Sequence, residues 1–210
     1  MTIYYEDEDI IALEKPYGVS SQESSGENMV SLLKSYTGCD IFCVHRLDTQ
    51  TTGIMVYAKN RESAALLSEQ VAKKTFHKEY LAVCHGKLDG CGTMVDFLYH
   101  DKIRNKSFVV KNKRNGAKEA RLEYSCVAVA SGEKPLSLVK INLLTGRTHQ
   151  IRVQLASRAH PLYGDGKYGA KDNDRIALHA TKITFYHPKT NIKMELESSP
   201  LGQIWQLFTK

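Results

Sequence analysis

The sequence has no long apolar run and no leader-like start. It has 210 residues, of which 42% are hydrophobic and 25% are charged, which is ordinary for a folded domain. No apolar run approaches the ~20 residues that a membrane-spanning helix needs. The start of the chain carries the acidic run from Glu6 to Asp9 and lacks the basic-then-apolar order of a secretory signal. These absences predict a soluble, cytoplasmic protein.

Signals for disulfides, metal sites and repeats are also weak. Five cysteines form an odd set in a chain without a secretory signal, which favours reduced thiols. Cys39 and Cys43 are four apart, but Cys84, Cys91 and Cys126 do not complete a zinc site. No internal repeat is visible, and no linker rich in Gly, Ser or Pro divides the chain. We therefore expect no metal, and a single domain over residues 1–210.

Short β-rich runs outnumber the helical patterns. Strands are predicted at Ile3–Tyr5, Ile10–Leu13, Ile54–Ala58, Glu79–His85, Lys118–Ala130, Leu136–Leu144, Ile176–Ala180, Ile183–Tyr186 and Lys193–Glu197. Helices are predicted at Met29–Tyr36 with Gly38 as C-cap, at Asn60–Lys74 with Asn60 as N-cap, at His149–Ala159 and at Ile204–Phe208. Without regular βα alternation, this pattern predicts an α+β domain on a mixed, mainly antiparallel sheet with flanking helices and loops.

The positive charge is concentrated in one segment. The chain has a formal net charge of +6, and one stretch holds Lys102, Arg104, Lys106, Lys111, Lys113, Arg114, Lys118 and Arg121. Glu119 is the one acidic residue between the ends of that stretch. Such a cluster beside a turn-rich hairpin suits contacts with a phosphate backbone. The alternative is a solvated basic hairpin tip with no partner.

The stretch from His45 to Gly53, HRLDTQTTG, lies between two apolar runs. Asp48 is therefore expected in a loop between two strands, where a rigid framework can present one carboxylate. The nearby threonines and Gly53 suit a turn that bonds to its own backbone. An ordinary turn salt bridge between Arg46 and Asp48 is the alternative.

The stretch from Thr145 to Arg152 places Arg152 on a predicted helix. From there its forked guanidinium can hold a carboxylate or a phosphate, although solvation on a helix surface is the alternative. The glycine-dense stretch from Pro161 to Gly169 is not a phosphate-binding loop, because it lacks the Walker spacing.

Taken together, these stretches resemble the RluA-type pseudouridine synthases, which isomerise chosen uridines within RNA. The signature HRLD-x-x-T-[S/T]-G corresponds to His45–Gly53, and Lys15-Pro16-x-Gly18 resembles the first motif of the family. Further matches are Lys78–Ala82, Thr145–Arg152 with Gly164–Gly169, and Leu178–Ala180 with His187-Pro188. The resemblance extends from about Ile3 to Phe208. The small S4 RNA-binding domain that precedes this region in many relatives is not found in the sequence.

The resemblance implies a set of site residues. Asp48 is the catalytic carboxylate, Arg152 its guanidinium partner, and Tyr80 the active-site tyrosine that stacks on the uracil and helps to remove a proton from the ring carbon. Leu178 packs against the reacting base, and Arg46 enters the space that the flipped uridine leaves.

His45 and Arg147 are further candidates for substrate contact. His149 and Asp165 are expected to support the framework without direct chemistry.

The resemblance also implies a partner and a reaction without a cofactor. The expected partner is a structured ribosomal or transfer RNA with the uridine in a stem-loop. No DNA and no membrane are expected as partners, and a monomer is the default.

Two other functions fit parts of the sequence. One is a catalytically weak RNA-binding or RNA-folding protein of the same fold. The other is a hydrolase that uses His45, Asp48 and His149 on a phosphodiester or glycosidic bond, which needs a metal or a second carboxylate.

Overall fold

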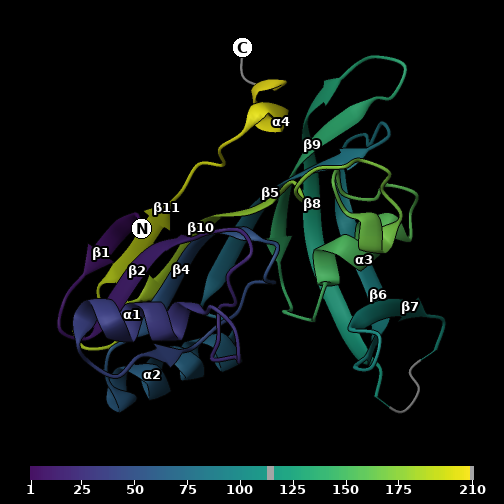
Figure 1. Cartoon of the computed structure of the whole chain (residues 1–210). Helices are drawn as coiled ribbons and strands as arrows, with labels where there is room; N and C mark the ends of the chain where they lie inside the picture. The colour runs from purple at the N-terminus through teal and green to yellow at the C-terminus, as the bar shows by residue number, and fades with distance from the viewer. Residues whose placement is uncertain (113–115, 209–210) are drawn as a thin grey trace. The chain divides into compact units, whose positions relative to one another are not determined.

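The chain folds into two compact units, which Figure 1 shows in a computed structural model that describes residues 1–112 and 116–208. Unit 1 comprises Met1–Glu79 and His179–Pro200, and unit 2 comprises Tyr80–Leu178 and Leu201–Lys210. A single catalytic domain over residues 1–210 stays a prediction.

The strands of unit 1 form a mixed sheet. Its neighbouring strands are, in order, β1 (Ile3–Glu6), β2 (Ile10–Lys15), β4 (Thr52–Ala58) and β10 (Leu178–Tyr186). Two short strands join them, as β3 (Phe42–Cys43) pairs with β4 and β11 (Lys193–Glu197) pairs with β10. The β4–β10 pairing is parallel, whereas the other pairings printed for these strands are antiparallel. The predicted mixed, mainly antiparallel sheet is therefore confirmed.

Two helices of unit 1 lie beside this sheet, α1 (Met29–Thr37) and α2 (Arg61–Lys73) (Figure 1). Gly38 ends α1 in the left-handed conformation with φ of 71°, as the sequence predicts. Asn60 caps α2 by accepting a hydrogen bond of 2.8 Å from the Ser63 amide. Leu67 of α2 packs with strand residues such as Val56 in a buried apolar cluster. Caps and apolar spacing thus explain both helices.

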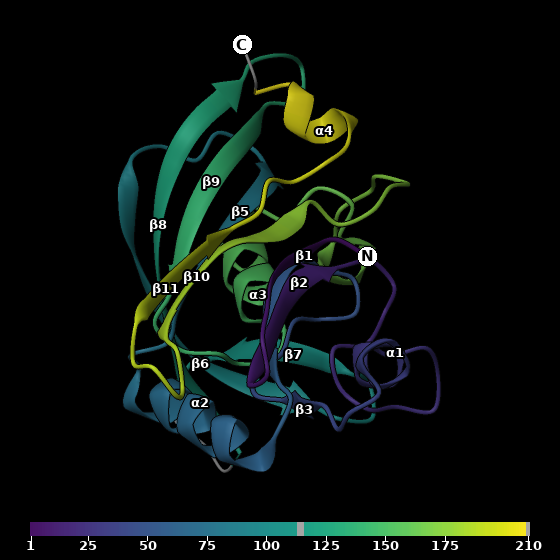
Figure 2. The same ribbon diagram turned by 90° about the vertical axis from the view of Figure 1, so that its left-hand side faces the viewer.

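Unit 2 contains the longest strands of the described chain. In order, its neighbours are β5 (His77–His85), β9 (Leu136–Leu143), β8 (Lys118–Ala130), β6 (Cys91–Asp101) and β7 (Lys106–Val110). β8 and β9 lie side by side in Figure 2 and pair in antiparallel fashion, as β6 does with both β7 and β8. β6 was not predicted, because Gly92, Asp96 and His100 interrupt any simple apolar alternation in its sequence.

The helices of unit 2 are short: α3 (Gln150–Ala156), the 3₁₀ turn η1 (Gly166–Tyr168) and α4 (Gln203–Gln206). α3 packs against β6, β7 and η1, with Val153 in a cluster that includes Leu98 and Ala120. This packing fixes the orientation of α3, and with it the direction in which Arg152 leaves the helix.

Several predicted elements have different bounds in the structure. The predicted helix to Ala159 ends at Ala156, because Ala159 is left-handed with φ of 63° and breaks the helical path. The two strands predicted around Ala180 and Ile183 are one strand, β10, and the C-terminal helix lies at Gln203–Gln206. None of the helices in residues 1–112 and 116–208 is long and apolar enough to cross a membrane.

Candidate active site

Asp48 lies in the loop between β3 and β4, as predicted, and its side chain is half-buried. The loop makes a tight turn in which the Thr51 amide donates to the Asp48 carbonyl over 2.9 Å. The Gly18 amide donates to the Thr49 carbonyl, also over 2.9 Å, and so ties the turn to the segment after β2. The backbone that carries the carboxylate is therefore held on two sides.

A buried lysine, Lys15, also holds the loop that carries Asp48. The Lys15 ammonium donates to the carbonyl oxygens of Pro16 at 2.8 Å, Val19 at 2.9 Å and Thr49 at 3.3 Å, and the residue is wholly buried. Burial lowers the pKa of Lys15 to about 8, although the negative charge of Asp48 opposes this shift. Lys15 is therefore an electrostatic neighbour of Asp48.

Lys15 belongs to the Lys15-Pro16-x-Gly18 motif, but the motif alone assigns it no role. The available signal was a lysine at the end of an apolar strand, followed directly by proline. A lysine is seldom fully buried without partners for its three donors.

The two residues before the turn differ in exposure. His45 is buried, and its Nε2 accepts a hydrogen bond of 3.2 Å from the Val56 amide, which fixes the ring against β4. Burial lowers the pKa of His45 well below its usual value, so the ring is neutral. Arg46 is exposed, and its Nη1 donates to Gln22 Oε1 over 3.3 Å. Arg46 thus faces water, whereas His45 supports the strand.

The other end of the loop is fixed by a close strand contact. Gly53 has φ of 119°, and a Cβ atom built on it would lie 2.3 Å from the carbonyl oxygen of Ala180. Next to it, Thr52 Oγ1 lies 2.8 Å from His179 Nδ1, and His179 Nε2 lies 2.9 Å from Ser198 Oγ. β4 and β10 can approach this closely because Gly53 has no side chain.

Arg152 in unit 2 holds a carboxylate, one of the two ligands expected for its forked guanidinium. Nε donates to Asp165 Oδ2 over 2.7 Å and Nη2 donates to Asp165 Oδ1 over 2.8 Å. The ring of Tyr168 lies 5.2 Å from Arg152 Cζ. Asp165 thereby fixes the position of the guanidinium, and its supporting role in an active site stays a prediction. The predicted partnership of Arg152 with Asp48 joins residues of different units and stays a prediction.

The other candidates in unit 2 lie on strands or beside α3. Tyr80 on β5 and Leu178 at the start of β10 are buried, at 3% and 4% exposure. Arg147 is half-buried, and its Nε donates to the Glu119 carbonyl over 2.8 Å. His149 Nδ1 lies 3.0 Å from the Tyr168 hydroxyl, in the same network as Arg152. The structure therefore brings together His149, Arg152, Asp165 and Tyr168.

Comparison with known proteins decides the family. The family model described as RNA pseudouridylate synthase matches residues 9–157. The chain belongs to the RNA pseudouridine synthase family. Its RluA type, predicted from the five motifs, is confirmed.

Curated relatives align with most of this chain. It is 36% identical over 207 residues to an uncharacterized RNA pseudouridine synthase of Mycoplasma pneumoniae, covering 94% of this chain and 66% of that protein. It is 32% identical over 232 residues to tRNA pseudouridine synthase C of Haemophilus ducreyi, covering 99% of this chain and 94% of that one. The chain thus spans just under two thirds of the length of the first relative and nearly all of the second.

A solved structure confirms the pseudouridine synthase fold. Human RNA pseudouridylate synthase domain containing 1 superimposes with a TM-score of 0.80 at 22% identity, covering 95% of this chain and 83% of that one. At this identity the likeness concerns the fold alone.

The basic segment, residues 102–121, is exposed over most of its described length. Lys102, Arg104, Lys111, Lys118 and Arg121 are exposed, and Lys106 is half-buried. Lys113 and Arg114 lie outside the described residues. The described cations surround the hairpin of β6 and β7 and the start of β8.

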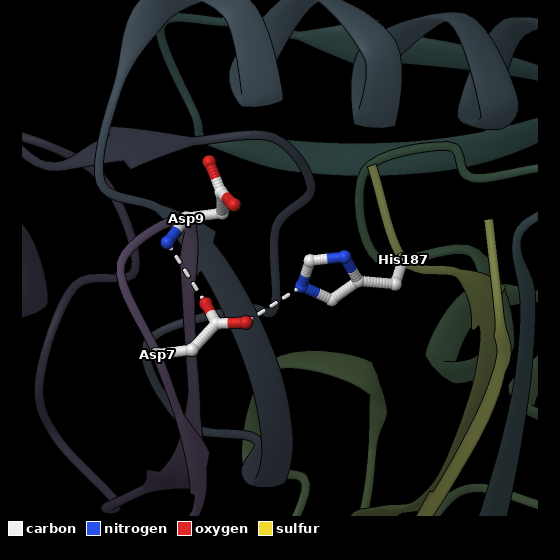
Figure 3. Close-up of side chains that lie close together, drawn as sticks. All are labelled: Asp7, Asp9 and His187. Carbon is white, nitrogen blue, oxygen red and sulfur yellow. Dashed lines mark hydrogen bonds and ion pairs between the residues drawn. The ribbon is translucent and has the colours of Figure 1, made fainter. Parts of the chain in front are cut away.

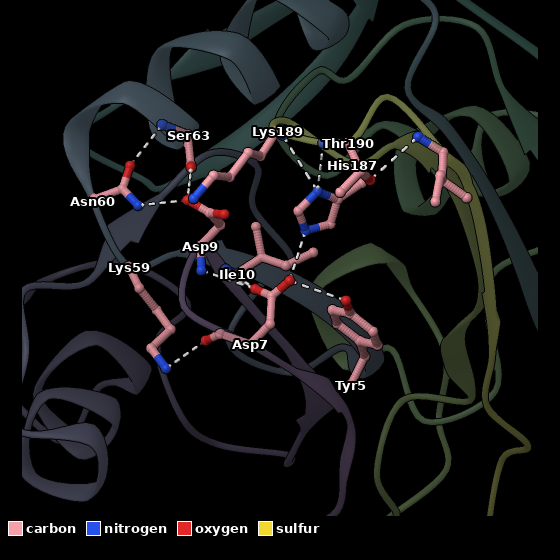
Figure 4. A network of polar contacts seen from close by, with 11 residues as sticks. Tyr5, Asp7, Asp9, Ile10, Lys59, Asn60, Ser63, His187, Lys189 and Thr190 are labelled. Atoms are coloured by element: carbon pink, nitrogen blue, oxygen red, sulfur yellow. Dashed lines mark hydrogen bonds and ion pairs between the residues drawn. The ribbon is translucent and has the colours of Figure 1, made fainter.

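One group of side chains in unit 1 has the spacing of metal ligands, namely Asp7, Asp9 and His187 (Figure 3). Asp7 already accepts hydrogen bonds from the amides of Asp9 and Ile10, from Tyr5 and from His187. Figure 4 shows the surrounding network, in which Asp9 accepts from Asn60 and Ser63. The group therefore acts as a hydrogen-bonded connection between β1, α2 and the turn after β10.

Proposed function

We propose that this chain isomerises specific uridines in structured RNA to pseudouridine, with Asp48 as the catalytic residue. The observation that carries the proposal is the Asp48 loop, in which one half-buried carboxylate is presented on a backbone held by Lys15. Membership of the pseudouridine synthase family supplies the reaction class. Family membership is established, whereas the activity and the substrate of the whole protein are what we propose.

The reaction moves one bond and one proton. The bond from ribose to the ring nitrogen breaks, the uracil turns, and ribose rejoins at a ring carbon. The proton on that carbon is removed and the freed nitrogen gains one, so the product is an isomer of the substrate. In the proposal Asp48 acts on the sugar, as nucleophile or as base. Either role needs a carboxylate presented on a fixed backbone, and Lys15 supplies that support through its hydrogen bond to the Thr49 carbonyl.

The remaining candidates take supporting roles in the proposal. Tyr80 stacks on the uracil and assists removal of the proton. Arg152 orients the Asp48 carboxylate, and Asp165 fixes the angle of the guanidinium through its two hydrogen bonds. Leu178 packs on the base.

Arg46 and Arg147 contact the RNA, and Arg46 occupies the place of the flipped uridine. His45 was predicted as a substrate contact. In the proposal it has a supporting role, because the hydrogen bond from the Val56 amide to its ring holds the start of the loop.

The proposed substrate is a uridine in a loop or bulge of a ribosomal or transfer RNA. Extrusion of a base costs a few kcal/mol and costs least where the base is unpaired. The exposed cations around β6 and β7 offset that cost through phosphate contacts. The tRNA named for the Haemophilus relative makes transfer RNA the first class to test. Cytoplasmic location and a monomeric state are part of the proposal.

The deciding experiment maps pseudouridines in total RNA from cells with and without the gene. We expect a site that is lost on deletion and restored by the wild type but not by Asp48→Asn. Asp40→Asn is the matched control, because Asp40 is an exposed carboxylate of the same unit, 3.5 Å from Lys34. It should restore the site fully.

Two outcomes would replace the proposal. Full restoration by Asp48→Asn would favour the RNA-folding protein, because that function needs no carboxylate at position 48. Release of free uracil or of cut RNA by the purified protein would favour a hydrolase.

A further inference from the structure

The hairpin of β6 and β7 ends in a hydrogen-bonded turn, residues 102–105, here called the tip. Asp101 and Lys106 are the last paired residues of the two strands. Asp101 Oδ1 accepts hydrogen bonds of 3.0 Å from the amides of Ile103 and Arg104. Asn105 closes the turn in the left-handed conformation with φ of 44°. Such side-chain bonds to the turn backbone restrict its conformation.

The side chain at the end of this turn is apolar. Ile103 is 99% exposed, and its neighbours Lys102 and Arg104 are exposed as well. A single exposed apolar side chain is common on proteins and needs no explanation by itself. The informative feature is its position between two cations at the end of a fixed hairpin, within the most basic part of the chain.

The tip is connected to the segment that holds Arg152. The Ser107 amide donates to the Tyr168 hydroxyl over 2.8 Å, and Ser107 Oγ donates to the Thr148 carbonyl over 2.6 Å. Lys167 Nζ donates to the Asn105 carbonyl over 3.0 Å. Since the Tyr168 ring also lies against Arg152, the tip keeps a defined place relative to that guanidinium within unit 2.

We propose that the tip is an RNA-contact element in which Ile103 packs against an unstacked base while Lys102 and Arg104 bind the phosphates on either side. The inference rests on the proposed function and extends it to how the RNA is held. Cationic flanks match a polyanion, and an apolar side chain can enter a step between bases that have lost their stacking. The expected ligand is therefore an RNA with unpaired nucleotides next to the target uridine.

The test measures RNA affinity in the Asp48→Asn chain, so that no turnover occurs. One labelled probe is a stem-loop RNA with unpaired uridines in the loop, and the other is a fully paired RNA duplex of the same length. The variants are Ile103→Ala, Ile103→Leu and Arg104→Ala. Val127→Ala is the matched control, because Val127 is another exposed β-branched residue of unit 2, at 56% exposure.

Salt dependence separates the two kinds of contact. Ile103→Ala should weaken stem-loop binding about fivefold to tenfold, because aliphatic groups that would be buried against the base are removed. The factor should be the same at every salt concentration, with little change for the duplex. Ile103→Leu and Val127→Ala should bind like the parent. Arg104→Ala should instead reduce the slope of log affinity against log salt by about 0.7 to 0.9, because one phosphate contact is lost.

Equal affinity of Ile103→Ala and the parent at all salt concentrations, or an equal loss on the duplex, would overturn the inference. Equal affinity would also be the result if the tip instead docked a protein. The proposed function is tested separately, by measuring pseudouridine formation with the wild-type protein, which retains Asp48. If the wild type forms pseudouridine but Ile103→Ala binds the stem-loop as well as the parent does, only the inference about the tip is overturned. If Ile103→Ala binds the stem-loop more weakly but the wild type forms no pseudouridine, only the proposed function is overturned.

Discussion

The guanidinium of Arg152 and the carboxylate of Asp165 form two parallel hydrogen bonds, Nε to Oδ2 at 2.7 Å and Nη2 to Oδ1 at 2.8 Å. Both residues are shielded from water, at 2% and 0% exposure. A buried charge that loses its partner retains its desolvation cost without compensation. The angle of Arg152 therefore depends on Asp165, whichever further group the guanidinium binds.

Asp165→Asn should be strongly destabilising. The amide keeps the shape of the side chain but removes the negative charge from the buried pair with Arg152, and breaking such a pair costs about 3–5 kcal/mol of the free energy of unfolding. Urea unfolding measures the change. Asp40→Asn is the control, because the Lys34–Asp40 pair is exposed and such pairs contribute about 0–1 kcal/mol. Similar losses in both variants would contradict a special role for the buried pair.

Lys15 should make stability rise with pH above about 8. Burial lowers the folded-state pKa of Lys15 to about 8, below the value near 10.4 in an unfolded chain. Between these values the unfolded state binds more protons, so the free energy of unfolding increases with pH. The wild type should gain about 3 kcal/mol relative to Lys15→Met across this range. Urea unfolding at a series of pH values measures the difference, and parallel curves would contradict it.

Gly53→Ala should disturb both the fold and the Asp48 loop. The added Cβ would meet the Ala180 carbonyl oxygen at 2.3 Å, and φ of 119° strains any residue with a side chain. We expect a loss of about 3 kcal/mol or more, with reduced pseudouridine formation. Gly26→Ala is the control, because its Cβ would meet nothing within 4 Å. Unfolding curves that match for the two variants would rule out the close approach of β4 and β10.

Asp7 should contribute stability that is lost in acid. Burial raises the pKa of Asp7, but hydrogen bonds from the Ile10 and Asp9 amides, Tyr5 and His187 outweigh it and lower the pKa (Figure 4). A carboxyl with a lowered folded-state pKa stabilises the fold above its unfolded pKa near 3.9 and loses that effect as pH falls through its folded value.

Asp7→Asn should therefore be less stable than the wild type at neutral pH, with the gap narrowing in acid. Thermal unfolding at neutral pH and near pH 3 measures this gap, and a constant gap would contradict the assignment.

Local sequence signals were sufficient for much of the fold. Asn60 as N-cap and Gly38 as C-cap were predicted from residue type and spacing alone, because a cap depends on groups within a few residues. Asp48 was placed in a loop between strands for the same reason. The end of α3 was missed, because nothing in the sequence marks Ala159 as left-handed. β6 was missed because its apolar residues do not alternate regularly.

The sequence by itself determined the family, the order of its motifs and most strands and helices, because these depend on residues close together in the chain. The tertiary structure alone decided the position of Lys15 beneath Thr49, 34 residues away, and the partner that Arg152 holds. Residue type indicates that a buried ammonium or guanidinium needs acceptors, but which acceptors are within reach depends on how the strands and turns pack.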